Sequence, residues 1–424
     1  MRGHGKARGG IVGVTALGLL MAVTGRAGAA DETGTPAAYV MAPGAQLVEG
    51  TAAKEGGPLL RPGPQTYKDS VRPGERRYYT VELDGGSSAY VSAVAAPRPG
   101  STMGPRDGIE VALEAPDGTP CGGGRHRTFL SAGGAYPVAD YAERVVRSGS
   151  PCASAGTYHF VLERGDATGG DGSPVPVELK YVTAPPDAGR PGVRGGGPSA
   201  SGGTWSSQVP EMPDGPGTQI TGGSGFHDAA EVAAGSWKDE LRPGETRFYR
   251  VSVDAGRQLF ARARFGAAPS GGPTARYVAG GVRLGLNNSA RGYVMNRTTG
   301  YQGRPVTVSL ATPPAAYANG VAIGDAVRGM RFAGWYYLQV SVSPKAGGTS
   351  AEVPVTLDVD VAAARPAGPD PKPAAGGAAA PVGGGPDGRL RVVGYAGVGT
   401  GSALLVGLAG WTLAARRRAR RPGA

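Results

Sequence analysis

The two cysteines have the most readily predicted chemistry of any side chains in the sequence. Cys121 and Cys152 are the only cysteines among the 424 residues. An even pair in an exported chain predicts a disulfide, which would close a loop of about 32 residues and stabilise the fold by roughly 3–4 kcal/mol. His126 lies near Cys121, but a single histidine is too few to complete a closed metal site.

The sequence carries no recognisable catalytic motif. It contains no Gly-x-Ser-x-Gly, no His-Glu-x-x-His and no Walker-type phosphate-binding loop. The glycine-rich stretch 397–401 lies inside the predicted membrane span and is not expected to bind phosphate. His159 matches Tyr337 in an internal repeat, which is more typical of a strand surface than of a catalytic base. His126 and His227 have no recognisable nucleophile beside them. We therefore expect no catalytic residue, no cofactor and no enzymatic activity.

The acidic residues are scattered, and oxygen-rich loops are what calcium requires. Asp358 and Asp360 alternate along one predicted strand, a pattern typical of a solvated face. Asp69 and Asp239 recur together with Arg77 and Arg247, which indicates a turn-capping carboxylate or an ion pair between strands. We predict no metal site from these residues.

Aromatic residues offer a third kind of chemistry, the binding of glycan or protein. Neighbouring residues of a strand point to opposite faces, so one aromatic of each adjacent pair is expected in the core. The core members would be Tyr79, Tyr158, Tyr249 and Tyr336. The candidate binding aromatics on the other face are Tyr78, Phe248, Trp335 and Tyr337. The second sheet or a sister domain could equally cover them.

An internal duplication supplies the elements that carry these side chains. The stretch WKDELRPGETRFYRVSVDAG (237–256) repeats YKDSVRPGERRYYTVELDGG (67–86), with eleven of twenty positions identical. Further matches follow in the same order: AGTYHFVLE (155–163) with AGWYYLQVS (333–341), VPVELKYV (175–182) with VPVTLDVDV (353–361), and the lead-in 46–50 with 219–223. Residues 36–183 and 218–361 are therefore two copies of one domain.

Each copy is predicted to be a β-sandwich of seven to nine short strands. The segment RFYRVSVDAG alternates polar and apolar residues with period two, as a half-buried strand does. Arg-Pro-Gly-Glu, at 72–75 and 242–245, places Pro and Gly where a tight turn needs a preset φ and a positive φ. Segments 184–217 and 362–390 are rich in Pro, Gly and Ala, and we interpret them as a linker and a stalk.

These motifs resemble the bacterial pre-peptidase C-terminal domain. The resemblance rests on the opening KDxxRPGExRxYxVxxDxG, the APDGTPC-type hairpin of copy one, the late strand AGTYHFVLE and the final strand VPVELKYV. Copy two departs from the pattern in GVRLGLNNSARGYVMNRTTGYQG. The resemblance implies a jelly-roll-like sandwich that accompanies secreted proteases, and it supplies no catalytic residue.

The ends of the chain predict export and anchoring. Residues 1–29 have the basic, apolar and small-residue regions of a signal peptide. Residues 392–415 are uncharged and long enough for a transmembrane helix, and the basic tail 416–424 marks the cytoplasmic side. Four basic residues of the signal and seven that flank the span account for the net charge of +11, so residues 31–388 have a net charge of zero. A nucleic-acid partner is therefore not expected.

The leading hypothesis is a single-pass type I membrane protein with extracellular domains. It would bind or scaffold a glycan or protein of the cell envelope, and its composition is typical of a high-GC actinobacterium. The alternative is a secreted-type hydrolase or peptidase, or an accessory subunit of one, suggested by the proteins in which such domains occur. The sequence does not name the ligand.

Overall fold

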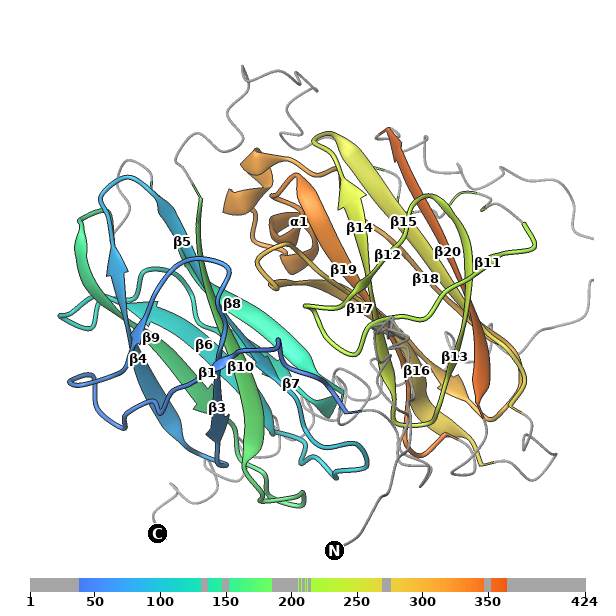
Figure 1. The fold of residues 1–424 in the computed structure, drawn as a ribbon, viewed down its shortest axis with the longest axis horizontal. Helices are drawn as coiled ribbons and strands as arrows, with labels where there is room; N and C mark the ends of the chain where they lie inside the picture. The colour runs from blue at the N-terminus through green and yellow to red at the C-terminus, as the bar shows by residue number, and fades with distance from the viewer. Residues whose placement is uncertain are drawn as a thin grey trace, which may run out of the picture. The chain divides into compact units, whose positions relative to one another are not determined.

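The computed structural model describes residues 38–130, 136–146, 152–184, 215–268, 276–346 and 352–363, together with residues 205, 207, 210 and 212. All of them fall within one compact unit. They form two β-sandwiches built from four five-stranded sheets, with one short α-helix and one 3₁₀ turn among the described residues (Figure 1). The predicted all-β fold is confirmed.

The first sandwich contains strands β1 to β10. One of its sheets has the order β1 (Gln46–Leu47), β3 (Tyr67–Val71), β10 (Val175–Ala184), β5 (Ser88–Ala95) and β8 (Val138–Arg144). The other has the order β2 (Leu59–Leu60), β4 (Arg76–Leu83), β9 (Gly156–Arg164), β6 (Gly108–Glu114) and β7 (Arg125–Thr128).

The second sandwich contains strands β11 to β20 and repeats this arrangement. One sheet has the order β11 (Thr218–Gln219), β13 (Gly235–Leu241), β20 (Val353–Ala363), β15 (Arg257–Phe265) and β18 (Val306–Ala311). The other has the order β12 (Ala230–Glu231), β14 (Thr246–Val253), β19 (Gly334–Val342), β16 (Val278–Asn287) and β17 (Tyr293–Tyr301). The 3₁₀ turn η2 (Tyr317–Val321) and helix α1 (Asp325–Gly329) precede β19.

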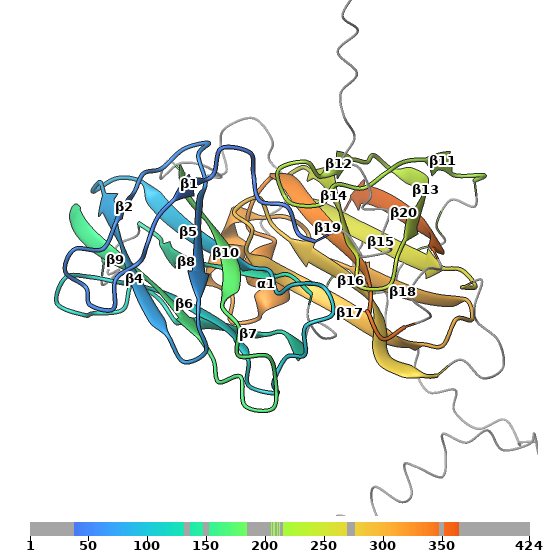
Figure 2. The ribbon, with the colours of Figure 1, turned by 60° about the horizontal axis from the view of Figure 1, so that its bottom comes forward.

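The chain passes between the two sheets of each sandwich in the same way in both copies, and in each copy one hairpin, β6–β7 or β16–β17, stays within a single sheet (Figure 2). Eight strands of each copy follow the connectivity of a double-sheet jelly roll. Each copy also begins with two short strands that pair in parallel with the first two long ones. The internal sequence repeat therefore corresponds to a repeat of topology.

The alternating residues of β14 explain how such a strand is built. Tyr249, Val251 and Val253 point into the core of the second sandwich, and all three are buried. Arg250 and Ser252, between them, are more exposed. This period of two requires an extended backbone, and burial of the apolar set stabilises the strand. Tyr79 and Val81 have the same place in the core of the first sandwich.

The residues repeated at the opening of each copy form one hydrogen-bond network. Tyr79 donates to an Asp69 oxygen at 2.8 Å, and the Gly50 amide donates to the same oxygen at 2.9 Å. Arg77 donates to the Gly50 carbonyl and forms an ion pair with Glu75. The Asp69 carboxylate thus ties the lead-in segment to a core tyrosine.

The second copy has the equivalent network. Tyr249 donates to Asp239 at 2.6 Å, and the Gly222 amide donates to the same oxygen at 2.8 Å. Arg247 donates to the Gly222 carbonyl. Gly50 therefore corresponds to Gly222 rather than to Gly223, and the predicted alignment of the two lead-ins was wrong by one residue. Two adjacent glycines left that alignment ambiguous in the sequence.

The tight turns before β4 and β14 have the backbone that the Pro-Gly pair predicts. Gly74 has a φ of +69° and Gly244 a φ of +91°. Glu75 accepts a hydrogen bond from the Arg72 amide, and Glu245 accepts one from the Arg242 amide. The shared sequence of this turn is therefore explained by the fold.

Several predicted segments lie outside the described residues. They are the signal peptide 1–29, most of the linker 184–217, nearly all of the stalk 362–390, the span 392–415 and the tail 416–424. Within the described part of the chain, no helix is long and apolar enough to cross a membrane.

Candidate ligand pocket

The predicted disulfide is confirmed. Cys121 and Cys152 are bonded, with Cα atoms 5.2 Å apart. Both residues are buried in the core of the first sandwich. The bond joins the segment after β6 to the segment before β9, so it acts as a structural link within one domain.

The histidines lie apart from one another and from any cluster of acids. His126 is exposed on β7, and His159 is half-buried on β9. His227 has its Nδ1 atom 3.9 Å from a carboxylate oxygen of Asp228. The described residues contain no group of three or more His, Cys, Asp or Glu side chains that could hold a metal ion.

The acidic pair of β20 is less exposed than its alternation suggests. Asp358 is fully buried, so its expected place on a solvated face was wrong. Arg262 and Arg264 of the neighbouring strand β15 form ion pairs with it at 2.9 and 3.1 Å. A carboxylate can be buried at this position because two guanidinium groups neutralise it.

The predicted binding aromatics do not form an exposed row. Phe248 is fully buried and Tyr78 is 8% exposed, so for these two the structure agrees with the alternative in which neighbouring parts of the protein cover them. Phe248 and Tyr337 pack against Phe226, with ring centroids 5.1 and 5.0 Å away. Trp335 is half-buried beneath the Arg250 guanidinium, which lies 4.8 Å from its ring centroid.

Residues of both sandwiches meet in a contact that we call the seam. Tyr39, from the segment before β1, packs edge-on against Phe248, with ring centroids 5.7 Å apart. Val94 and Ala139 of the first sandwich complete this apolar cluster. A second cluster joins Tyr90 and Tyr141 of the first sandwich to Ala290 and Phe332 of the second.

Among the described residues, three ion pairs cross the seam. They are Arg127–Asp325 at 2.8 Å, Glu143–Arg331 at 2.5 Å and Glu178–Arg291 at 3.2 Å. Arg331 and Arg291 are almost fully buried, and Glu178 is fully buried. A buried charge that has lost its partner costs several kcal/mol of stability, so removing one member of such a pair destabilises the contact more than removing both. The seam is therefore specified by charge as well as by apolar contact.

Arg291 shows how one turn is adapted to the seam. It lies between β16 and β17 with a φ of +63°, the single positive φ at a non-glycine residue in the described part of the chain. Its guanidinium reaches Glu178 of the first sandwich and lies 5.2 Å from the Phe226 ring centroid. Tyr39 donates to the other oxygen of Glu178 at 2.5 Å. Backbone strain at a contact residue is tolerated where the surroundings compensate for it.

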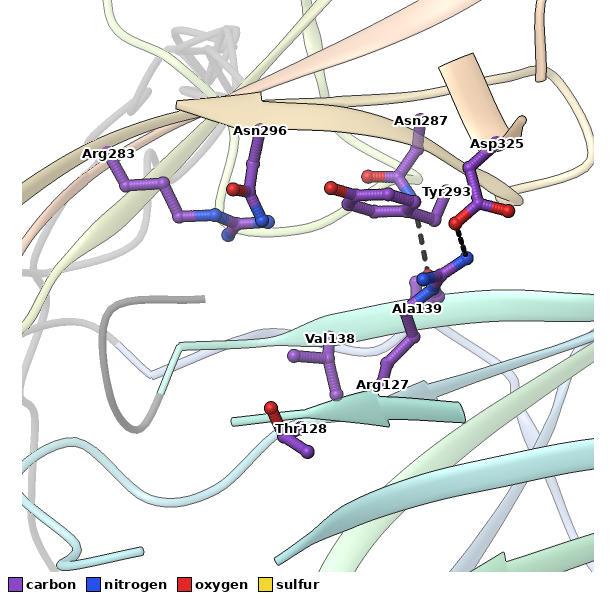
Figure 3. A pocket seen from close by; sticks show the side chains of 9 residues that line it. All are labelled: Arg127, Thr128, Val138, Ala139, Arg283, Asn287, Tyr293, Asn296 and Asp325. Carbon is purple, nitrogen blue, oxygen red and sulfur yellow. Dashed lines mark hydrogen bonds and ion pairs between the residues drawn. The ribbon is translucent and has the colours of Figure 1, made fainter. Parts of the chain in front are cut away.

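A pocket of about 230 Å³ opens beside these ion pairs (Figure 3). Strands β7 and β8 line it from the first sandwich, and β16, β17 and α1 line it from the second. Its lining residues are Arg127, Thr128, Val138, Ala139, Arg283, Asn287, Tyr293, Asn296 and Asp325. Seven of these nine side chains are polar, aromatic with a hydroxyl, or charged, so the pocket suits a hydrophilic ligand.

The charges at one end of the pocket balance one another. Arg127 forms ion pairs with Asp140 at 2.6 Å and Asp325 at 2.8 Å, and it lies over the Tyr293 ring at 4.0 Å from the centroid. Arg328 forms a second ion pair with Asp325. Burial raises the pKa of the Asp140 carboxyl, against the opposing effect of Arg127. Two arginines therefore match two carboxylates here.

Arg283, at the other end, is different because it has no carboxylate partner among the described residues. Its side chain is 2% exposed. Nη1 donates to the Gln339 side-chain oxygen at 2.9 Å, and Nε is buried without a hydrogen-bond partner. Burial lowers the pKa of this guanidinium to about 10. An arginine so placed has an unmet requirement for a negative charge.

A short polar chain holds Arg283 in place. Gln339 accepts from Arg283 and donates to the Asn287 side-chain oxygen at 2.9 Å. Asn287 donates in turn to the carbonyl of Arg291 at 2.9 Å. These three side chains are buried on the outer face of β16 and β19, whose inner faces form the core. The pocket is thus connected to the turn that crosses the seam.

Little in the sequence indicates this pocket. Arg127 and Asp325 are 198 positions apart, and no motif relates them. One signal is present in GGVRLGLNN, where Arg283 alternates with apolar residues in a strand that is otherwise uncharged. A single arginine on the outer face of such a strand indicates a buried or interface charge.

Comparisons with known proteins give no family for the chain. No protein-family model matches it, and no curated protein is significantly similar. Solved structures that it resembles include a periplasmic inhibitor of g-type lysozyme from Aeromonas hydrophila, at 14% identity over 31% of this chain and 95% of that one, with a TM-score of 0.18.

Two tandem modules are also similar. The tandem CBM22-1-CBM22-2 domain of Xyn10C from Paenibacillus barcinonensis is 12% identical over 71% of this chain and 87% of that one, with a TM-score of 0.19. The tandem CBM51 modules of Sp3GH98, a family 98 glycoside hydrolase of Streptococcus pneumoniae, are 10% identical over 69% of this chain and 83% of that one, with a TM-score of 0.17. Scores this low support no functional conclusion.

Proposed function

We propose that the chain is a non-catalytic cell-surface protein whose two β-sandwiches act together to bind a ligand of the cell envelope. The observation that carries this proposal is the polar pocket lined by both sandwiches. A ligand in this pocket would contact both domains at once. The three ion pairs of the seam would hold the two walls of the pocket in a fixed position relative to each other. The ligand would be a glycan or a protein.

Asn296 provides a direct test of binding at the pocket. Its side chain lines the pocket and has no hydrogen-bond partner among the described residues, so its replacement should leave the fold intact. We expect the full-length protein to retain envelope glycans or proteins, to lose affinity for them on Asn296→Leu, and to leave peptide and glycan substrates uncleaved.

Gln219→Leu is the matched control for this test. It also replaces a side-chain amide by leucine, but at an exposed position of β11, which does not line the pocket. This variant should bind as the unmodified protein does. Turnover of a substrate, or equal binding by the Asn296→Leu and Gln219→Leu proteins, would contradict the proposal.

Anchoring in the membrane belongs to the same proposal. It is supported by the signal-like residues 1–29 and the uncharged segment 392–415 followed by arginines. A reporter fused after Ala424 should be cytoplasmic, and one inserted near Gly376 should be extracellular. The reverse labelling would exclude a type I topology. Membership in the pre-peptidase C-terminal family remains a prediction.

A further inference from the structure

We propose that the pocket binds a carboxylate group, specifically that of an acidic sugar unit in an envelope glycan, with Arg283 as its counter-ion. This inference rests on the proposed function, because it names the ligand class of the same pocket. It starts from the one cation of the lining whose charge is not matched by a described residue. Asp140 and Asp325 are paired with Arg127 and Arg328, whereas the hydrogen-bond partner of Arg283 among the described residues is the neutral amide of Gln339.

The edge of Arg283 that has no hydrogen-bond partner among the described residues, formed by Nη2 and the buried Nε, has the arrangement of N–H groups that pairs with a carboxylate. Gln339 occupies Nη1, and the described residues offer no partner to Nε or Nη2. These two nitrogens form one side of the planar guanidinium, and two parallel N–H groups match the two oxygens of a carboxylate. The buried surroundings strengthen such a pair, because water competes little for either partner.

The backbone beneath the guanidinium is shaped to hold it. A Cβ atom at Gly285 would come within 2.7 Å of Nη2 of Arg283, so the guanidinium lies directly against this glycine. Gly285 and Arg283 share one face of β16 because they are two residues apart. Figure 3 shows the Arg283 side chain directed toward Asn296, among the labelled residues of the pocket. The position of the charge is therefore set by the chain.

The rest of the lining favours a sugar acid over other anions. Asn296, Tyr293 and Asp325 offer amide, phenol and carboxylate groups, which suit the hydroxyls of a sugar. The volume of about 230 Å³ is below the roughly 300–1,000 Å³ of pockets that enclose drug-sized ligands, so a single sugar unit fits better than a long segment.

The test is a calorimetric titration of the full-length protein with glucuronate and galacturonate, compared with glucose and galactose. We expect the uronates to bind at least about tenfold more tightly than the neutral sugars, as a charge-assisted pair would allow. Arg283→Met should abolish this difference, and Arg283→Lys should restore part of it, since the charge returns without the planar fork. Arg304→Met, which removes the same charge from an exposed position, is the control and should bind as the unmodified protein does.

Three results would overturn the inference. Uronate binding that survives Arg283→Met would place the anion elsewhere. Binding of neutral envelope glycans without preference for uronates, unaffected by Arg283→Met, would contradict the proposal that the ligand is acidic. The proposed function would still hold. Binding of short peptides through a free C-terminal carboxylate, lost on amidation and on Arg283→Met, would assign the pocket to a protein ligand. If no envelope material binds at all, the proposed function fails as well.

Discussion

Arg283→Met should make the unliganded protein more stable while removing its response to acidic ligands. Methionine is close to arginine in length and is unbranched, so it can fill the same space without a buried charge. A side chain retained for the fold would show the opposite behaviour, because its loss would leave a hole or an unmatched partner. The substitution therefore separates a binding role from a structural one.

The expected magnitude follows from the surroundings of Arg283. Burial lowers its pKa from the ordinary arginine value to about 10. That difference corresponds to a cost of about 3 kcal/mol for carrying the charge in the folded state, at roughly 1.4 kcal/mol for each pKa unit. The variant also loses the bond from Nη1 to Gln339, which offsets about 1–2 kcal/mol. The net expectation is a gain in unfolding free energy of about 1–2 kcal/mol at neutral pH.

The gain should depend on pH with a definite sign. Because the folded-state pKa of Arg283 lies below its unfolded value, the cost is complete below about pH 10 and shrinks as the pH rises above it. The stability advantage of Arg283→Met should therefore narrow above that pH. Urea unfolding of both proteins at about pH 7, 9 and 10.5 measures this directly. A loss of more than about 2 kcal/mol at neutral pH would show that Arg283 supports the fold and is not retained for a ligand.

Three further outcomes follow from the same structure. Tyr249→Ala, in the core of the second sandwich, should cost about 3–5 kcal/mol, and Lys238→Ala, at an exposed position, under about 0.5 kcal/mol; thermal melts that reverse this order would mean that β14 faces the other way. Cys152→Ser should lower the unfolding free energy by about 2–4 kcal/mol under oxidising conditions, with no difference from the unmodified protein after reduction. A double-mutant cycle of Glu178→Gln and Arg291→Met should show a coupling of at least about 1 kcal/mol by urea unfolding, and a coupling near zero would mean that the sandwiches do not depend on each other.

Most of the fold could be predicted from local sequence patterns. Alternation in RFYRVSVDAG predicts a strand with Tyr249 and Val251 inward, and the structure buries both. The repeated Pro-Gly turn predicts a positive φ at Gly244, which is observed. These features depend on neighbours within a few residues, where sequence and backbone are closely related. The role of Asp239 was harder to predict, because its partners Gly222 and Tyr249 come from separate segments.

The pocket could not be predicted in the same way. Its walls come from β7, β8, β16, β17 and α1, and the internal repeat gives no information about a contact between unlike surfaces of two copies. Phe248 illustrates the difficulty. Its place on the outer face of β14 was predicted, but its burial depends on Tyr39 of the other sandwich and on Phe226. Exposure of an outward side chain is decided by what packs on it, and strand periodicity does not contain that information.

The Nε–H signal of Arg283, followed by NMR during a titration with glucuronate, reports on ligand binding at the guanidinium itself. The signal can be assigned by its absence from the spectrum of Arg283→Lys. Nε is buried and unpartnered among the described residues. We predict a downfield shift of its proton and slower exchange with water as the carboxylate binds, with saturation at the affinity measured by calorimetry. An Arg283 signal that stays unchanged while glucuronate shifts those of other arginines would show that the acid binds elsewhere.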